Sequence, residues 1–493
     1  MFDLTSEQLL LVALLVPFAG AALIPLFHRV PNVREAVTLV AAAVLFLSVI
    51  GLLQPVLNGD RPEALNLWIA PGLVLAFKVE PLGLLFALVA SGLWIVTSVY
   101  SIGYMRANDE PRQTSYYVCF AVALGCAVAI AFAKNLFTLF LFYEALTLST
   151  YPLVAHKGDA NAIRGGRIYL LMLLGTSLLF LLPAIVITIV LAGTGDFVPG
   201  GILAGKASGL VLGVLLGLYA FGIGKAALMP LHFWLPAAMV APTPVSALLH
   251  AVAVVKAGVF SILKVVVYVF GPGTLLGSGQ SQWLVYVAGA TIVVASLVAL
   301  RQDNLKKLLA YSTVSQLSYV ILATAVLMPI SIRGAAMHIA AHAVSKITLF
   351  FAAGSIYTAA HKTEISQMRG IGRRMPWTMG AFTIGALSMI GLPSTAGFLG
   401  KWFMLSGAFQ GGQWVVVVVI VLSTVLNAAY FLPIVFNAFA SEPEAGGRAA
   451  HAHGEAPWPM VAALTLTAAG TIALFWFPGI ALDLSSSMIA DKP

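Results

Sequence analysis

The chain has 493 residues, of which 60% are hydrophobic and only 9% are charged. A soluble domain carries about 25% charged residues, so this composition excludes a soluble enzyme and indicates a chain that crosses a lipid bilayer many times. The formal net charge of +8 does not indicate a partner made of nucleic acid, because the basic residues are spread over short loops between apolar segments.

Apolar segments of membrane-spanning length follow one another along the whole chain. At about 20 residues per span, there is room for about 14 transmembrane helices, and no soluble domain fits between them. We therefore predict an all-α polytopic membrane protein with a single membrane domain over residues 1–493. The predicted helix cores are 6–27, 33–55, 80–104, 114–132, 135–155, 166–193, 208–228, 243–268, 282–300, 307–327, 335–358, 378–400, 412–437 and 458–480.

The loops between these predicted helices differ in their content of arginine and lysine. Basic residues after odd-numbered helices outnumber those after even-numbered helices about three to one. Because arginine and lysine collect in cytoplasmic loops, we expect the odd loops in the cytoplasm and both termini on the non-cytoplasmic side. The odd loops hold Arg29, Arg34, Arg106, Arg112, Lys157, Arg164, Arg167, Arg301, Lys306, Lys307, Lys362, Arg369, Arg373, Arg374 and Arg448; the even loops hold Arg61, Lys78, Lys134, Lys206 and Arg333.

Two stretches break the rules of a regular helix at membrane depth. Residues 222–246 contain Lys225 between glycines and prolines, and residues 391–401 again combine glycine, proline and a lysine, Lys401. Interrupted helices in the two halves of a transporter indicate an internal repeat with ion sites at the breaks. We place helices 1–3 in 1–111, the repeats in 112–268 and 280–437, and helix 14 in 438–493. The alternative for each break is ordinary packing, since membrane helices tolerate proline and glycine.

Glu144 is the only acidic residue in the middle of a predicted span, at the centre of residues 135–152. A carboxylate at this depth is costly unless it is paired or faces an internal cavity, so it indicates an ion or proton path. Its candidate partner is Lys225, in a run whose other ionisable group is His232. A carboxylate that moves relative to this lysine would switch it between holding and releasing a proton. The alternative is a static buried pair that fixes helix register.

Two further helices carry several titratable groups each. His250 and Lys256 lie six residues apart, about 9 Å along a helix and about 120° apart in direction, and each is able to pass a proton to water between helices. His338, His342 and Lys346 recur every four residues and share one face. The histidine spacing also suits zinc, but no carboxylate or cysteine lies nearby in the sequence as a third ligand, so a proton relay is favoured. His250 alone is equally consistent with a packing role.

Charged residues near predicted helix ends have simpler explanations. Asp303 is expected to cap the helix that follows it and to pair with Lys306, and Lys307 belongs to the same charged helix start. Lys264 is expected near a membrane face as an anchor. Cys119 and Cys126 form no C-x-x-C motif, and the chain has no phosphate-binding glycine loop. We therefore expect no cofactor, no bound metal and no redox chemistry of its own.

Five stretches together resemble one family. They are Phe142–Leu146, Gly224–Pro236, Ala241–Ala251, Asp303–Ser312 and His342–Lys346. They are similar to the antiporter-like subunits shared by Mrp cation/proton antiporters, respiratory complex I and membrane-bound hydrogenases, and the match covers nearly the whole chain. Residues Lys346–Gly354 and Lys362–Gly370 look closest to the D-type subunits of Mrp complexes. The chain departs from the family at Glu80, where related chains often carry an aspartate.

This resemblance implies 14 helices, two inverted five-helix repeats with helices 7 and 12 broken, and a hydrated charge axis through the membrane centre. The residues that match the axis of the family are Glu144, Lys225, Lys256, Lys346 and Lys401; the supporting residues that we expect are His232, His250, His338, His342, Lys306 and Lys307. The implied location is the cytoplasmic membrane of a bacterium or archaeon, in a complex with other subunits.

The expected function is proton translocation in an Mrp-type complex that exchanges Na⁺ or another monovalent cation for protons. One alternative is the same fold in a redox-driven pump, where a dehydrogenase or hydrogenase arm supplies the energy. The other is a secondary carrier that works alone. Neither the coupled cation nor the driving partner is encoded in this chain.

Overall fold

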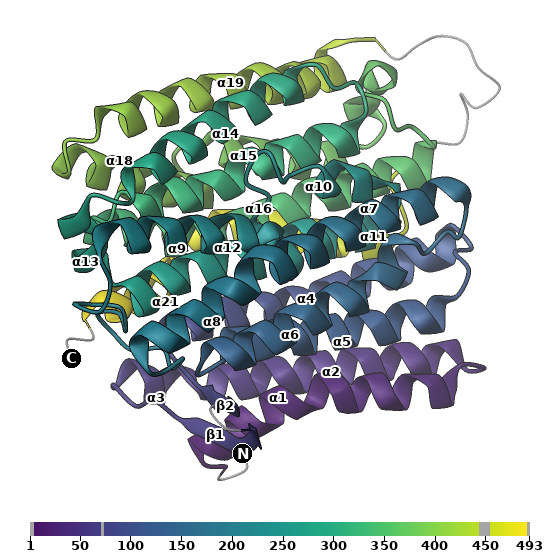
Figure 1. The fold of residues 1–493 in the computed structure, drawn as a ribbon. Helices are drawn as coiled ribbons and strands as arrows, with labels where there is room; N and C mark the ends of the chain where they lie inside the picture. Colours follow the sequence, from purple (N-terminus) through teal and green to yellow (C-terminus); the bar gives the residue numbers. More distant parts are fainter. Residues whose placement is uncertain (1–3, 71–72, 443–453, 491–493) are drawn as a thin grey trace.

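The structure is a computed structural model that describes residues 4–70, 73–442 and 454–490. Arg448, one of the basic loop residues of the sequence analysis, lies outside these ranges. The chain forms a bundle of roughly parallel helices (Figure 1). The helices of the first half are α1 (Ser6–Leu23), α2 (Pro31–Gly51), α3 (Leu53–Leu57), α4 (Pro81–Ala107), α5 (Gln113–Ala131), α6 (Leu136–Val154), α7 (Ala160–Thr176), α8 (Leu182–Ala192), α9 (Gly209–Gly222), α10 (Trp234–Ala237), α11 (Thr243–Ala247), α12 (Val254–Val265) and α13 (Pro272–Ser278).

The second half contains the longest helix of the described chain. Its helices are α14 (Gln282–Leu300), α15 (Leu305–Ala325), α16 (Pro329–Ala360), α17 (Pro376–Ile390), α18 (Ala396–Gln410), α19 (Trp414–Ala440), α20 (Trp458–Trp476) and α21 (Gly479–Ala490). Short 3-10 helices cover Ile24–Phe27, Gly224–Ala226, Ala238–Val240, Ile365–Met368 and Ile371–Arg373, and π-helical turns cover Ser177–Leu181, Leu248–Val252 and Val266–Phe270.

The predicted fold of many membrane-spanning helices is confirmed, and the predicted count of about 14 agrees approximately with the structure. Twelve helical segments of the described chain are long and apolar enough to cross a membrane. The two remaining predicted spans are the broken ones: α9 leads into the irregular segment before α10, and α17 is separated from α18 by residues 391–395. The division into repeats at 112–268 and 280–437 stays a prediction.

One small β-structure was not predicted. Strands β1 (Glu63–Ala70) and β2 (Leu73–Lys78) form an antiparallel hairpin between α3 and α4. Alternating burial is absent from β1, which is mostly exposed; the period-2 signal that reveals a half-buried strand is therefore missing. Backbone hydrogen bonds tie the hairpin to the end of α5, from the Lys78 N–H to Phe132 O at 2.8 Å.

The loops gather at two ends of the bundle according to the parity of the helix that they follow. The end that carries the hairpin, here called the hairpin end, also holds the start of α1, because Thr5–Glu7 lines a hollow with Asp60–Pro62. At the opposite end, here called the basic end, the loops after odd-numbered spans contact one another through Arg106 and Asn32, Arg112 and His156, Ser366 and Asp303, and Gly370 and Asn437. The loops rich in arginine and lysine thus lie at the basic end, and the loops with few of these residues lie at the hairpin end.

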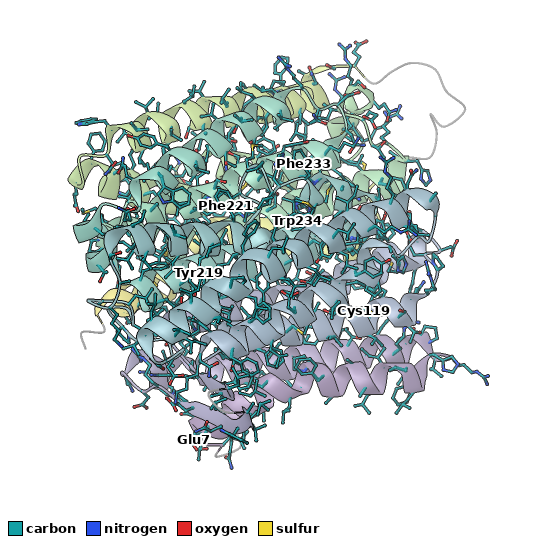
Figure 2. All side chains as sticks on the ribbon, in the orientation of Figure 1. Glu7, Cys119, Tyr219, Phe221, Phe233 and Trp234 are labelled. Carbon is teal, nitrogen blue, oxygen red and sulfur yellow. The ribbon has the colours of Figure 1, made fainter. Side chains whose placement is uncertain are left out.

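Three spans occupy the centre of the bundle. The segment Thr243–Phe270 is buried throughout its most apolar window, and α15 and α16 are nearly so, whereas no more than 39% of the corresponding window is buried in α1, α2, α19 and α20. The central spans are also those that carry most of the predicted histidines and lysines, so the polar groups are placed where other helices, and not lipid, surround them. Figure 2 shows side chains filling the space between the helices; of the residues labelled around the first broken helix, Tyr219 and Trp234 are buried, whereas Phe233 is exposed.

The positive-inside rule predicts that the basic end faces the cytoplasm. A Thr363→Cys variant, exposed at the basic end, should resist an impermeant thiol reagent in intact cells and react after the membrane is opened. An Asn66→Cys variant, exposed on the hairpin, should react in intact cells, and the unmodified chain supplies the background from Cys119 and Cys126. The reverse labelling pattern would place the basic end outside.

Candidate functional site

The first broken helix places Lys225 in a tight turn inside the bundle. Helix α9 ends at Gly222, and Gly224–Ala226 forms a 3-10 turn. A Cβ atom on Gly222 would lie 2.4 Å from Leu181 N, and one on Gly224 would lie 2.2 Å from Thr176 Oγ1. Both positions therefore require glycine, because the turn packs directly against the π-helical segment of the neighbouring span.

Lys225 is fully buried and is held by neutral oxygens of α6. Its Nζ donates hydrogen bonds to Tyr143 O at 2.8 Å and to Thr147 Oγ1 at 2.6 Å. The same Nζ lies 3.2 Å from the centroid of the Tyr143 ring, a cation–π contact. The Lys225 N–H also donates to the Tyr143 hydroxyl at 3.1 Å. The helix break is thus fastened to the segment that carries Glu144.

Glu144 follows Tyr143 on α6, and the Ser177 hydroxyl of the next span lies close to its carboxylate. Both carboxylate oxygens are buried, and neither accepts a hydrogen bond of regular geometry within the described ranges. Lys225 interacts with it electrostatically, but the lysine donates its hydrogen bonds elsewhere. The sequence prediction brought the right two residues together; the structure holds them as neighbours rather than as a bonded pair. A small movement of either side chain would change the charge that each one faces.

His250 lies in a π-helical turn, Leu248–Val252, that the sequence did not reveal. Its ring is fully buried, and neither ring nitrogen has a hydrogen-bond partner among the described residues. The Phe350 ring lies 4.9 Å away. Single π-helical turns are frequent at functional sites, and a buried imidazole with two free nitrogens is able to accept and return a proton. A pure packing role for His250, the alternative left open by the sequence, would not explain why two polar nitrogens are buried there without hydrogen-bond partners in the described part of the chain.

Lys256 contacts His342 directly, which joins helix α12 to helix α16. The Lys256 Nζ and the His342 Nδ1 form a hydrogen bond between two fully buried side chains. The His342 ring stacks on His338 with centroids 6.0 Å apart. His338 Nε2 in turn bonds Gln316 Oε1 at 3.0 Å. The two histidines predicted to share a helical face therefore do so, and they link the lysine to α15.

Lys346 reaches α15 one turn further along the same face of α16. Its Nζ donates to Ser312 Oγ at 2.9 Å and to Leu309 O at 3.4 Å. The Tyr430 hydroxyl of α19 lies within hydrogen-bond distance of the same Ser312 oxygen, at 3.2 Å, and of Asn427 Oδ1, and its single proton serves one of these two acceptors at a time. Lys346 thus faces hydroxyl and carbonyl oxygens, with no carboxylate among its described partners.

Lys401 binds the buried C-terminal end of α17 at the second helix break. Its Nζ donates to Met389 O at 2.8 Å and to Ile390 O at 2.9 Å, the last carbonyls of α17. The final carbonyls of a helix lack partners and carry a partial negative charge, so they attract a cation. The ammonium also lies 4.9 Å from the centroid of the Tyr319 ring. The second break therefore supplies an acceptor site for its own lysine.

Met389 O is the point at which these groups meet. It accepts hydrogen bonds from Lys401, from Gln316 Nε2 at 3.4 Å and from Asn427 Nδ2 at 3.4 Å. One branch runs through Gln316 and the two histidines to Lys256; the other runs through Asn427, Tyr430 and Ser312 to Lys346. Asn427 and Tyr430 were missed by the sequence analysis because single polar residues in an apolar span give no periodic signal.

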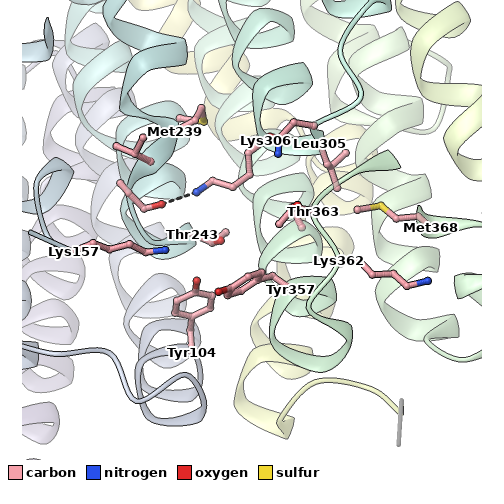
Figure 3. A pocket seen from close by; sticks show the side chains of 14 residues that line it. Tyr104, Lys157, Met239, Thr243, Leu305, Lys306, Tyr357, Lys362, Thr363 and Met368 are labelled. Atoms are coloured by element: carbon pink, nitrogen blue, oxygen red, sulfur yellow. Dashed lines mark hydrogen bonds between the residues drawn. The ribbon is translucent and has the colours of Figure 1, made fainter. Parts of the chain in front are cut away.

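Three of the predicted supporting residues lie apart from this network. His232 bonds the backbone oxygen of Pro230 at 3.3 Å, and the Lys307 side chain is exposed. Lys306 donates to Ala241 O at 2.5 Å and lines a cavity of about 240 Å³ at the basic end, together with Tyr104, Lys157, Thr243, Tyr357 and Lys362 (Figure 3). Lys306 therefore faces the loop that precedes the His250 segment.

Two expectations about charged residues were wrong. Asp303 does not cap α15: Asn304 does, accepting a hydrogen bond from the Lys307 N–H at 3.1 Å, while Asp303 binds Ser366. Lys264 is not a surface anchor, because it is fully buried and forms an ion pair of 3.1 Å with Glu80. The Asp303–Ser366 and Lys264–Glu80 contacts join segments distant in sequence, which local patterns do not encode.

The turn that holds Lys225 also packs against α12 through Gly258. A Cβ atom there would lie 2.4 Å from Lys225 C and Ala226 N. We expect Gly258→Ala to lower the apparent melting temperature of the purified protein, since overpacking costs about 1–3 kcal/mol. Gly273→Ala is the matched control, because its Cβ would meet nothing within 4 Å. Equal melting temperatures for the two variants would contradict the close packing.

Comparison with known proteins places this arrangement in a family. Residues 133–427 match the family described as NADH:quinone oxidoreductase/Mrp antiporter, transmembrane. The chain is 32% identical over 448 residues to NADH-quinone oxidoreductase subunit N of Desulforudis audaxviator (strain MP104C), covering 90% of this chain and 88% of that relative. It is 31% identical over 420 residues to the A/B subunit of a probable K(+)/H(+) antiporter of Rhizobium meliloti (strain 1021), covering 82% of this chain and 40% of that relative.

The fold is shared with a protein of known structure. A chain in the structure of the Mrp complex from Dietzia sp. DQ12-45-1b superposes with a TM-score of 0.85 at 21% identity, covering 99% of this chain and 97% of the other. The resemblance seen in the five sequence stretches is thereby confirmed. The chain belongs to the NADH:quinone oxidoreductase/Mrp antiporter transmembrane family.

Proposed function

We propose that this chain is the proton-translocating subunit of a multisubunit antiporter that exchanges Na⁺ or another monovalent cation for protons. The observation that carries the proposal is the buried set of contacts from Lys256 through His342, His338 and Gln316 to Lys401. It crosses the centre of the bundle and consists of groups that bind and release protons or orient hydrogen bonds. Glu144 and Lys225 form its counterpart in the first half, with Lys346 as a branch.

The proposed mechanism uses the incomplete pairing of Glu144. When the carboxylate lies close to Lys225, it stabilises the ammonium form; when it moves away, the lysine is left with only the neutral oxygens of Tyr143 and Thr147. A desolvated ammonium without a counter-charge is unfavourable, so the lysine then gives up its proton. The released proton passes towards His250 and Lys256. Ion movement elsewhere in the complex would drive the displacement of Glu144.

Two other functions use the same residues. The relative that aligns over most of its length belongs to an NADH-quinone oxidoreductase, which favours a redox-driven pump as the second candidate. A carrier that works alone is the third. All three place the protein in the cytoplasmic membrane of a bacterium or archaeon with the basic end inside, and the first two require other subunits as partners.

Removing the Glu144 charge tests the proton path. We expect the Glu144→Gln variant to assemble and to lose cation-driven pH change in vesicles by about 10²-fold or more, the range for removing a proton-transfer group. The Glu144→Asp variant keeps the charge and should retain part of the activity. The content of assembled protein is quantified in the same vesicles. Normal exchange by the glutamine variant would contradict the proposal.

Dependence on partners separates the functional classes. The chain has one carboxylate in the middle of a span, and a dedicated cation site would require more oxygen ligands. We therefore expect the purified chain on its own to show no cation/proton exchange in proteoliposomes, whereas the co-expressed complex does. Exchange by the isolated chain that is abolished in Glu144→Gln would instead identify a self-sufficient carrier.

A further inference from the structure

Helix α12 carries a second fully buried lysine that the proposed path does not use. Lys264 follows Lys256 by eight residues, about 12 Å along the helix axis, towards the hairpin end. Lys256 belongs to the central network through His342, while Lys264 forms the 3.1 Å ion pair with Glu80 Oε2. One helix thus connects the centre of the bundle with a buried acid–base pair near its hairpin end.

The Glu80–Lys264 pair lies where three spans meet. Glu80 precedes the first residue of α4, Lys264 is on α12, and the Lys264 Nζ also donates to Ala133 O just after α5, at 2.8 Å. The Phe197 ring lies 4.5 Å from the ammonium. Glu80 Oε2 has no partner among the described residues other than the Lys264 ammonium, so this lysine is the counter-charge that the carboxylate faces.

The β-hairpin covers this pair on its outer side. Strand β2 bonds the end of α5 on both sides of Ala133, through the Lys78 N–H to Phe132 O at 2.8 Å and the Lys134 N–H to Ala76 O at 3.0 Å. Beyond the strand, Glu63 pairs with Lys134 at 2.6 Å and with Lys78 at 4.0 Å, and these side chains are partly exposed. The buried Glu80–Lys264 pair is therefore separated by strand β2 from the partly exposed ion pairs of Glu63.

Two aromatic rings separate this pair from the central lysine. Phe260 lies four residues from both Lys256 and Lys264, so the three side chains share one face of α12. The Phe260 ring packs against Phe86 of α4 with centroids 5.0 Å apart, and both rings are buried. The Lys264 ammonium lies 5.7 Å from the Phe260 centroid. Apolar constrictions of this kind block water until they open.

A polar atom lies beside the aromatic pair. Ser261, next to Phe260, is fully buried, and its Oγ has no hydrogen-bond partner among the described residues. Because buried polar groups without protein partners usually bind ordered water, this hydroxyl is a site for water between the two lysines when the rings separate. Lys264 lies three residues further along the same side of the helix.

We propose that Glu80 and Lys264 form the proton outlet of this protein at the hairpin end, with Phe86 and Phe260 as its gate. This inference rests on the proposed function. With the gate open, the Lys256 ammonium gives one proton through water to the Glu80 carboxylate, leaving a neutral lysine and a carboxylic acid. Glu80 then releases that proton past the hairpin and returns to the carboxylate, paired with Lys264, which remains protonated throughout.

A static ion pair that only holds three spans together is the competing explanation. Single substitution of Glu80 would leave Lys264 buried without a counter-charge, which is destabilising in itself. The double variant Glu80→Gln/Lys264→Met removes both charges, so it restores a neutral interior without restoring a proton acceptor. Glu35→Gln is the control for losing a buried, paired carboxylate elsewhere in the chain, a more disruptive change than the neutral double variant, because Glu35 pairs with Arg34 and Arg106 but touches neither α12 nor the central network.

The decisive measurement is cation-driven proton flux by the whole complex in vesicles, normalised to the amount of assembled complex. We expect the double variant to lose about 10²-fold or more of the flux, while Glu35→Gln retains it. Full flux in the double variant would overturn the proposal in favour of a static pair. The Glu144→Gln complex, measured in the same assay, separates the two proposals. If Glu144→Gln is inactive while the double variant has full flux, the outlet alone is overturned. If Glu144→Gln is active, the proposed function itself fails.

Passive proton conductance tests the gate independently of exchange and of the ion pair. We expect Phe260→Ala to raise proton leak several-fold in proteoliposomes under an imposed membrane potential, because a smaller side chain opens the constriction. Phe120→Ala is the control, since Phe120 is equally buried on α5 and contacts Tyr116 instead of this pair. An unchanged leak in Phe260→Ala, or the same rise in Phe120→Ala, would show that Phe86 and Phe260 are not a gate.

Discussion

The structure depends on how buried ammonium groups are stabilised where water and counter-ions are scarce. Lys225, Lys346 and Lys401 each donate to backbone carbonyl or hydroxyl oxygens, and no described carboxylate bonds any of them. Neutral oxygens satisfy the hydrogen bonds of an ammonium but do not cancel its charge. Because leaving a buried charge uncompensated costs about 3–5 kcal/mol, the distance of a counter-charge such as Glu144 matters more for these lysines than it would at the surface.

The helix breaks supply those oxygens in two different ways. At the second break, α17 ends and presents its last carbonyls to Lys401, five residues into α18. At the first break, the lysine itself lies in the turn and reaches an intact helix, α6, through Tyr143 O and Thr147. A regular helix has no free carbonyls in its interior, so an unbroken α17 would leave Lys401 without its acceptors. The glycines are needed at the first break for close packing, not only for flexibility.

The sequence predicted the ionisable groups well and their contacts poorly. A charge in a long apolar run stands out, so Glu144 and the lysines were found, and the spacing of His338, His342 and Lys346 placed them on one face. The π-helical turn at His250 gives no such signal, because it is produced by packing. The Lys256–His342 contact, the Glu80–Lys264 pair and the Asp303–Ser366 bond all join residues far apart in the chain, and such pairings emerge only when the helices are assembled.

The asymmetry of charge between the two halves has a consequence for how protons are shared. The first predicted repeat has one carboxylate in the middle of a span, Glu144, close to one lysine, whereas the second has Lys346 and Lys401 with no such acid among the described residues. Lys256 and His342 share one hydrogen bond across the boundary between the halves, and two positive charges at that distance would repel. Lys256 and His342 therefore cannot both be charged without repulsion, so their protonation states are linked.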